Sequence, residues 1–202
     1  TGSGTFGPAR VRVSSDASNV TIVFDMNATF RYTGSSGSGG VALYPQTDNN
    51  TITVNAGKTL TFVVNASMAA GGSNRVSASV DLTVNVYGAI NMVSSASPLT
   101  LKATTGKTIS LTVFTGGSMT VGGGAYVSTV ADGGTTSLTV NGTMTLGGPI
   151  DFSNPSFEVS GSGTFTLAAA GNLMIGHAQG IAASGDRKSP RLKSSHPSGS
   201  RL

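Results

Sequence analysis

The chain contains no cysteine and no tryptophan, and only 10% of its 202 residues are charged. The absence of cysteine excludes disulfide bonds, zinc-thiolate sites and thiol catalysis. No apolar run approaches the roughly 18 residues of a membrane-spanning helix, so we expect no membrane span. Glycine is abundant instead, at 29 residues, and serine and threonine are frequent. This composition is typical of all-β proteins with many turns.

The charges that are present do not form a basic face on the main part of the chain. Residues 1–185 contain seven Lys or Arg and seven Asp or Glu, so their net charge is zero. The whole excess of +4 comes from residues 186–202, which have five basic residues and one aspartate. We therefore expect no nucleic-acid partner, because binding to phosphates requires clustered cations.

The segment Leu138–Leu146, LTVNGTMTL, carries the main secondary-structure signal. Apolar residues alternate with threonines on either side of Asn141-Gly142, which is a turn dipeptide. Alternation of period two, interrupted by a turn, predicts two short strands joined at a corner. Similar segments recur along most of the chain.

The recurrence has a spacing that predicts a solenoid. The second apolar residue of each apolar-x-apolar triplet serves as a marker, and these markers are Val13, Tyr32, Val54, Val84, Leu101, Val121, Val140, Val159 and Ile175. Most of them are separated by about 19 residues, and a fixed period of this length is typical of stacked repeats. We predict an all-β, right-handed parallel β-solenoid with coils of about 19 residues. The alternative is an antiparallel β-sandwich, which also has closely spaced strands.

This solenoid hypothesis makes two specific predictions about stacking. The inward residues Val54, Val84, Leu101, Val121, Val140 and Val159 would form one column, separated from each other by about one strand spacing. The preceding outward residues would form one exposed ladder, consisting of Thr53, Thr83, Thr100, Thr120 and Thr139. We interpret this ladder as structural, since threonines paired across strands stabilise a sheet. A single row lacks the second regular row that an ice-binding face would need.

Residues 1–185 are predicted to form the solenoid fragment, and residues 186–202 to be a disordered tail. The longest marker spacing, from Val54 to Val84, predicts an insertion at about 66–79 that loops out of one coil. In the tail the alternating pattern stops. Residues 186–196, DRKSPRLKSSH, resemble the translation of a common sequencing adapter at nine of eleven positions. This resemblance implies that the tail is not native and that the chain is a metagenomic fragment.

No candidate catalytic or metal-binding set stands out. The carboxylates are scattered, with no two at the same position of adjacent predicted repeats, whereas acid-base catalysis needs carboxylates on one face. His177 has no partner histidine before the tail, so we expect no metal and no cofactor.

The segment from Val159 onward, VSGSGTFTLAAAGNLMIGHAQGI, and the earlier TVNGTMTL and NATFRYTG carry a family resemblance. They resemble the glycine- and threonine-rich β-solenoid repeats of large bacterial secreted or surface proteins, adhesin-like and associated with type IX secretion. The resemblance implies a non-catalytic structural or adhesive stalk at the cell surface or outside the cell. Its partners would be surface glycans, other cell-surface proteins and neighbouring repeats. The alternatives are a carbohydrate-active β-helix enzyme fragment and an ice- or crystal-binding solenoid.

Overall fold

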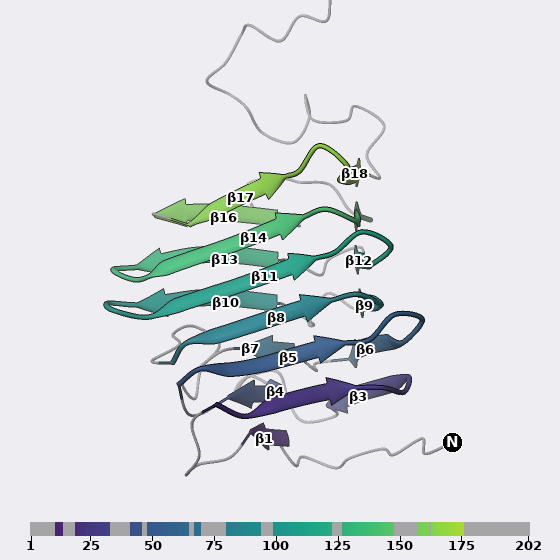
Figure 1. Ribbon diagram of the computed structural model, residues 1–202, viewed down its shortest axis with the longest axis horizontal. Coiled ribbons are helices and arrows are strands. Elements are labelled where there is room, and N and C mark those ends of the chain that lie inside the picture. Colours follow the sequence, from purple (N-terminus) through teal and green to yellow (C-terminus); the bar gives the residue numbers. More distant parts are fainter. Residues whose placement is uncertain are drawn as a thin grey trace, which may run out of the picture.

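The computed structural model describes residues 11–13, 19–32, 41–45, 48–64, 67–69, 80–93, 99–122, 127–147, 157–161 and 163–175 (Figure 1). These ranges consist of β-strands and the turns beside them, with no helix. The strands form three parallel sheets of six strands each, and every third strand along the chain belongs to the same sheet. The chain is therefore a parallel β-solenoid, which confirms the predicted architecture and excludes the antiparallel sandwich.

Each coil contributes one strand to each sheet, and we name the sheets A, B and C in the order in which a coil visits them. Sheet A contains β1 (Val11–Val13), β4 (Val41–Pro45), β7 (Ser67–Ala69), β10 (Leu99–Thr104), β13 (Val127–Asp132) and β16 (Phe157–Gly161). Sheet B contains β2 (Thr21–Phe24), β5 (Asn50–Val54), β8 (Leu82–Val86), β11 (Thr108–Val113), β14 (Thr135–Val140) and β17 (Thr164–Leu167). Sheet C contains β3 (Ala28–Tyr32), β6 (Thr59–Val64), β9 (Ala89–Met92), β12 (Ser118–Val121), β15 (Thr143–Leu146) and β18 (Asn172–Ile175).

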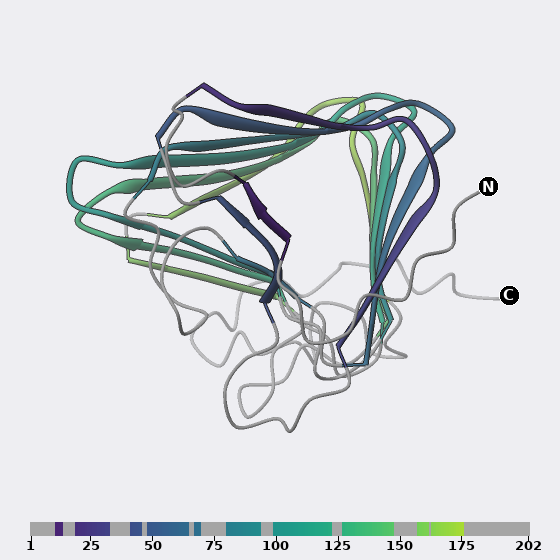
Figure 2. The same cartoon turned by 90° about the horizontal axis from the view of Figure 1, so that it is seen from below.

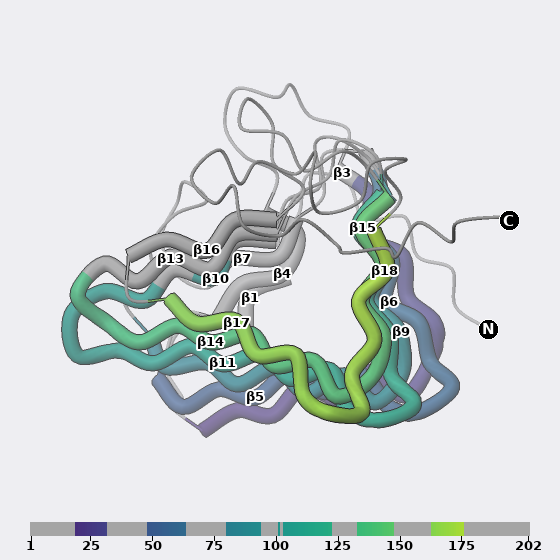
Figure 3. Tube along the Cα trace, turned by 90° about the horizontal axis from the view of Figure 1, so that it is seen from above, coloured from purple at the N-terminus to yellow at the C-terminus, as the bar shows by residue number. Residues whose placement is uncertain are grey.

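The winding is right-handed, as predicted. Figure 3 looks down the stack with the C-terminal strands nearest the reader, and the path from sheet B to sheet C to sheet A runs counter-clockwise. Sheet B forms the long lower side of this view and sheet C the right side. The view from the other end shows successive coils overlying one another (Figure 2).

The coil is longer than the sequence period suggests. Thr108 N–H bonds to Asp81 of the preceding coil, 27 residues away, and the register of β11 with β14 has the same spacing. Nearer the N-terminus Thr59 N–H bonds to Asn27 of the preceding coil, 32 residues away. The prediction of coils of about 19 residues, a length typical of stacked repeats, is therefore wrong. From Leu101 onward the markers lie on β10, β12, β14, β16 and β18, so each interval crosses two strands, or two thirds of a coil.

The same miscount explains why the predicted inward column is wrong. Val54, Val84 and Val140 lie in sheet B, Leu101 and Val159 in sheet A, and Val121 in sheet C. All except Val159, whose side chain is not described, are buried as expected. The long interval from Val54 to Val84 runs from β5 to β8 and is two residues short of a full coil, since Val84 pairs with Ile52. Ser67–Ala69, placed by the prediction in that insertion, forms β7 and pairs with β4 and β10; residues 70–79 lie outside the described part.

The core is built from inward rows that run along the stack. Sheet B contributes two such rows, with Ile52, Val84, Leu111 and Leu138 in one and Val54, Val86, Val113 and Val140 in the other. Sheet C contributes Leu60, Ile90, Met119 and Met144 in one row and Phe62, Met92, Val121 and Leu146 in the next. All sixteen are at most 1% exposed. Burial on this scale is the main stabilising term, since each large apolar side chain contributes about 1.5–3 kcal/mol.

The corner between sheets B and C follows the sequence prediction. β14 ends at Val140, Asn141-Gly142 makes the turn, and β15 begins at Thr143. The even spacing across the corner keeps side-chain parity, so Val140 and Met144 both face the core. This corner and the one between sheets A and B present the polar groups described below.

Candidate functional site

The five threonines of the predicted ladder do not form one file, and that prediction is wrong. Thr53 and Thr139 share one outward row of sheet B, whereas Thr83 lies in the adjacent row of the same sheet. Thr100 belongs to β10 in sheet A, and Thr120 belongs to β12 in sheet C. From Thr83 onward the threonines come from every second strand, whereas a row takes one residue from every third strand. Thr53 and Thr83 are three strands apart but two residues out of register, since Thr83 pairs with Thr51.

Sheet B instead carries two adjacent outward rows that the sequence reading missed. The first consists entirely of hydroxyl residues, namely Thr21, Thr51, Thr83, Ser110, Ser137 and Thr164. The second is Val23, Thr53, Asn85, Thr112, Thr139 and Thr166. We call this surface the hydroxyl face. Its residues repeat about every 4.8 Å along the stack and about every 6.6 Å along each strand, and none of them is charged.

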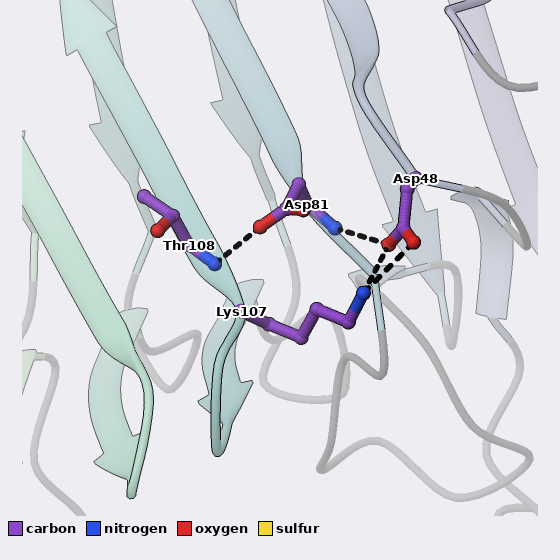
Figure 4. Close-up of polar contacts among 4 residues, drawn as sticks. All are labelled: Asp48, Asp81, Lys107 and Thr108. Atoms are coloured by element: carbon purple, nitrogen blue, oxygen red, sulfur yellow. Dashed lines mark hydrogen bonds and ion pairs between the residues drawn. The ribbon is translucent and has the colours of Figure 1, made fainter.

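A charged cluster lies at the corner between sheets A and B, where the hydroxyl face ends (Figure 4). Lys107 precedes β11 and reaches past the intermediate coil to Asp48, with Nζ 2.8 Å from both carboxylate oxygens. The Asp81 backbone N–H donates to Asp48 Oδ1 at 3.1 Å. Asp81 Oδ1 in turn accepts from the Thr108 N–H at 2.6 Å. These bonds connect three successive coils at one corner.

The same contacts set the protonation state of the ion pair. Hydrogen bonds from the Lys107 ammonium and, secondarily, from the Asp81 N–H lower the pKa of Asp48 below its ordinary value of 3.8. The bond to Asp48 raises the pKa of Lys107 above 10.5. Both groups are therefore charged at neutral pH. Both side chains are partly exposed, at 26% for Lys107 and 40% for Asp48, so solvent screens their attraction.

The cluster corrects the expectation that the carboxylates are scattered. Asp48 and Asp81 occupy the same corner of adjacent coils, although they are 33 residues apart in sequence. The true coil length was the missing information, since the shorter predicted repeat does not align them. Their observed role is to accept hydrogen bonds from backbone N–H groups. Asn27 Oδ1 does the same for Thr59 N–H at 2.9 Å, and Asn50 Oδ1 for Val20 N–H at 3.0 Å.

A shallow hollow of about 470 Å³ lies beside the charged cluster. It is lined by Asn49, Thr51, Asp81, Leu82, Thr83 and Thr108. Thr51 and Thr83 belong to the hydroxyl face, and Asn49, Asp81 and Thr108 form the next row toward the corner, each directly before a paired position of sheet B. We call this hollow the corner hollow.

The opposite end of sheet B, at the corner toward sheet C, carries an aromatic pair. The Tyr87 and Phe114 rings stack with centroids 4.3 Å apart and an interplanar angle of 14°. In an earlier coil Asn55 Nδ2 donates to Asp25 Oδ1 at 3.1 Å. Because the two rings face each other along the stack, their contact stabilises the corner.

The described residues contain no group of three or more His, Cys, Asp or Glu side chains placed to hold a metal ion. His177 lies outside those residues. Within the described part of the chain, no helix is long and apolar enough to cross a membrane. Comparison with known protein families, curated proteins and solved structures finds no match to this chain.

Proposed function

We propose that this chain is a non-catalytic structural and adhesive stalk segment of a larger exported bacterial surface protein. The observation that carries the proposal is the continuous stacking of the coils into three six-stranded parallel sheets, with one register irregularity, between β4 and β7. In such a stack each coil pairs its strands with those of the neighbouring coils, so length grows with the number of coils while the cross-section stays constant. That is the geometry a spacer between a cell and its surroundings requires.

The outer surface supports the adhesive part of the proposal. The hydroxyl face offers many weak donors and acceptors at regular intervals, which suits multivalent contact with glycans or with other surface proteins. Lys107 and the paired aspartates fix the corner through three coils, so this surface is held in one shape. The resemblance to glycine- and threonine-rich surface repeats supports an extracellular or cell-surface location.

A bead assay tests this proposal. Beads coated with the whole chain would be passed over immobilised polysaccharides, with retention under flow measured together with the reducing ends released into the supernatant. We expect retention without release. Release of reducing ends that rises with time would contradict the proposal and favour the carbohydrate-active enzyme.

The two adjacent rows of the hydroxyl face favour one second candidate, a surface that binds ice or another crystal. The sequence reading found only one row, and the register supplies the second. The presence of Val23 and Asn85 in that second row makes it less uniform than the first. Thermal hysteresis of the chain distinguishes the candidates. Hysteresis that disappears in Ser110→Lys would replace the stalk proposal, and its absence is the result we expect.

A further inference from the structure

The corner hollow is a preformed polar site that the stalk function does not explain. Its walls come from residues in or directly before three successive strands, β5, β8 and β11, and all of them except Leu82 belong to two adjacent outward rows. Its volume of about 470 Å³ lies within the roughly 300–1,000 Å³ of small-molecule sites. Three threonines, one asparagine and one aspartate line it, so hydroxyl, amide and carboxylate groups converge on one space.

Asp81 is the central group of the corner hollow, and its neighbours hold it in place. Its backbone N–H donates to Asp48, and its Oδ1 accepts from Thr108 N–H. Oδ2 takes part in neither bond. A carboxylate oriented in this way offers a ligand hydroxyl a charge-assisted hydrogen bond, which is about twice as strong as a neutral one. Little side-chain entropy would be lost on binding because the carboxylate is already oriented.

The charge balance selects the class of ligand. Lys107 is paired with Asp48, so Asp81 leaves a net negative charge beside the corner hollow. Phosphate, sulfate and uronate groups would be repelled. Hard cations such as Ca²⁺ prefer six to eight oxygen ligands, whereas the described residues hold no group of three acidic or histidine side chains. A neutral polyhydroxyl ligand matches the hydrogen-bonding groups of the corner hollow, since the threonine hydroxyls both donate and accept and the carboxylate accepts.

We propose that the corner hollow binds a neutral oligosaccharide, with Asp81 Oδ2 and the hydroxyls of Thr51 and Thr83 as the ligand-contacting groups. Because Thr51 and Thr83 are paired neighbours in a row parallel to the stack, the saccharide lies along the stack and spans adjacent coils. This proposal rests on the adhesive part of the stalk function and specifies which surface carries it.

Calorimetric titration of the whole chain tests the site. The probes are the neutral hexasaccharides of β-1,4-glucose, β-1,4-xylose, β-1,4-mannose and N-acetylglucosamine, with hexagalacturonate as the charged comparator. The site variant is Thr51→Val with Thr83→Val, which removes two hydroxyls and keeps strand-favouring side chains. The matched control is Thr120→Val with Thr145→Val, the same change at paired neighbours on sheet C, outside both the corner hollow and the hydroxyl face. Asp81→Asn is a third variant that keeps an acceptor for Thr108 N–H.

We expect at least one neutral hexasaccharide to bind. The site variant should weaken that binding about tenfold, as loss of two neutral hydrogen bonds implies, and Asp81→Asn about tenfold or more, as loss of a hydrogen bond to a charged group implies. The control should change it less than about twofold. Three results would overturn the proposal: no neutral probe binds, hexagalacturonate binds best, or the control loses as much affinity as the site variant. Chromatography of the saccharide after titration detects any cleavage, and so distinguishes failure of the stalk function from failure of the saccharide site. Binding with cleavage contradicts the stalk function and leaves the site intact, whereas no binding contradicts the site alone.

Discussion

At the scale of single residues, the corners depend on side chains that complete hydrogen bonds where the strands end. Asp48, Asp81, Asn27 and Asn50 each accept from a backbone N–H of an adjacent coil. The sequence identifies these residues as turn formers, because Asp and Asn favour turns. It does not identify their partners, since each bond joins residues about one coil apart and the coil length is visible only in the register.

Gly142 is predicted to be the more sensitive of two turn glycines. A Cβ at Gly142 would collide with the backbone oxygens of Gly117 and Phe114, whereas a Cβ at Gly106 would meet nothing within 4 Å. Gly106 has a φ of +76°, so its replacement introduces backbone strain alone. We expect Gly142→Ala to lower the free energy of unfolding by about 3 kcal/mol and Gly106→Ala by about 1 kcal/mol. Denaturant titrations of both variants measure this; equal losses would contradict the close packing at this corner.

The ion pair between Lys107 and Asp48 predicts a pH dependence of stability with a defined sign. The folded pKa of Asp48 is lowered, so its contribution is present above pH 3.8 and is lost as pH falls through the folded value. The folded pKa of Lys107 is raised, so its contribution is present below pH 10.5 and is lost as pH rises through the folded value.

We therefore expect the melting temperature of the wild type to exceed that of Asp48→Asn by a constant amount between about pH 5 and about pH 9. The difference should shrink below pH 3.8 and above pH 10.5. Melting curves of both proteins across this range provide the measurement. A difference that grows as the pH falls below 3.8 would show that the assigned sign is wrong.

At the scale of strands, alternation determines which face of each strand is buried. Leu138 and Val140 of β14 are fully buried, and the intervening Thr139 is only partly buried. The same alternation is present in the sequence, and it correctly predicts the strands, the turn between them and the inward residues. It could not assign a strand to sheet A, B or C, because Leu101, Val121 and Val140 have similar local patterns in three different sheets.

Replacement of Val140 by aspartate tests the inward face of β14. Val140 is 0% exposed and lies in a row between Val113 and Leu167, so Val140→Asp buries an unpaired charge at a cost of several kcal/mol. Thr139→Asp, one residue earlier on the outward side, should cost less than about 1 kcal/mol. Hydrogen exchange should accelerate in β11, β14 and β17 of the first variant only. Equal acceleration in the second would contradict the assigned faces.

At the scale of the whole molecule, the sequence predicts a right-handed parallel solenoid but gives the wrong coil. The period read from the sequence is two strand steps, and a three-sided coil requires three. From Val84 onward this error places the predicted inward residues and threonines in the wrong sheets, and Val54 and Val84 are in addition two residues out of register. The wrong coil length also concealed the hydroxyl face and the proximity of Asp48 to Asp81. Pairing between strands one full coil apart is a property of the assembled stack, and no local pattern encodes it.

Site-directed cross-linking tests the coil length most directly. Because the chain contains no cysteine, only the introduced cysteines can form a disulfide. Thr112 and Thr139 are paired neighbours on sheet B, about 4.8 Å apart, a separation within the roughly 4.4–6.8 Å between Cα atoms that a disulfide spans. Thr120 and Thr139, neighbours under the shorter predicted coil, lie in different sheets. Under mild oxidation we expect Thr112→Cys with Thr139→Cys to form an intramolecular disulfide rapidly, and Thr120→Cys with Thr139→Cys to remain reduced. The reverse result would contradict the three-sided coil.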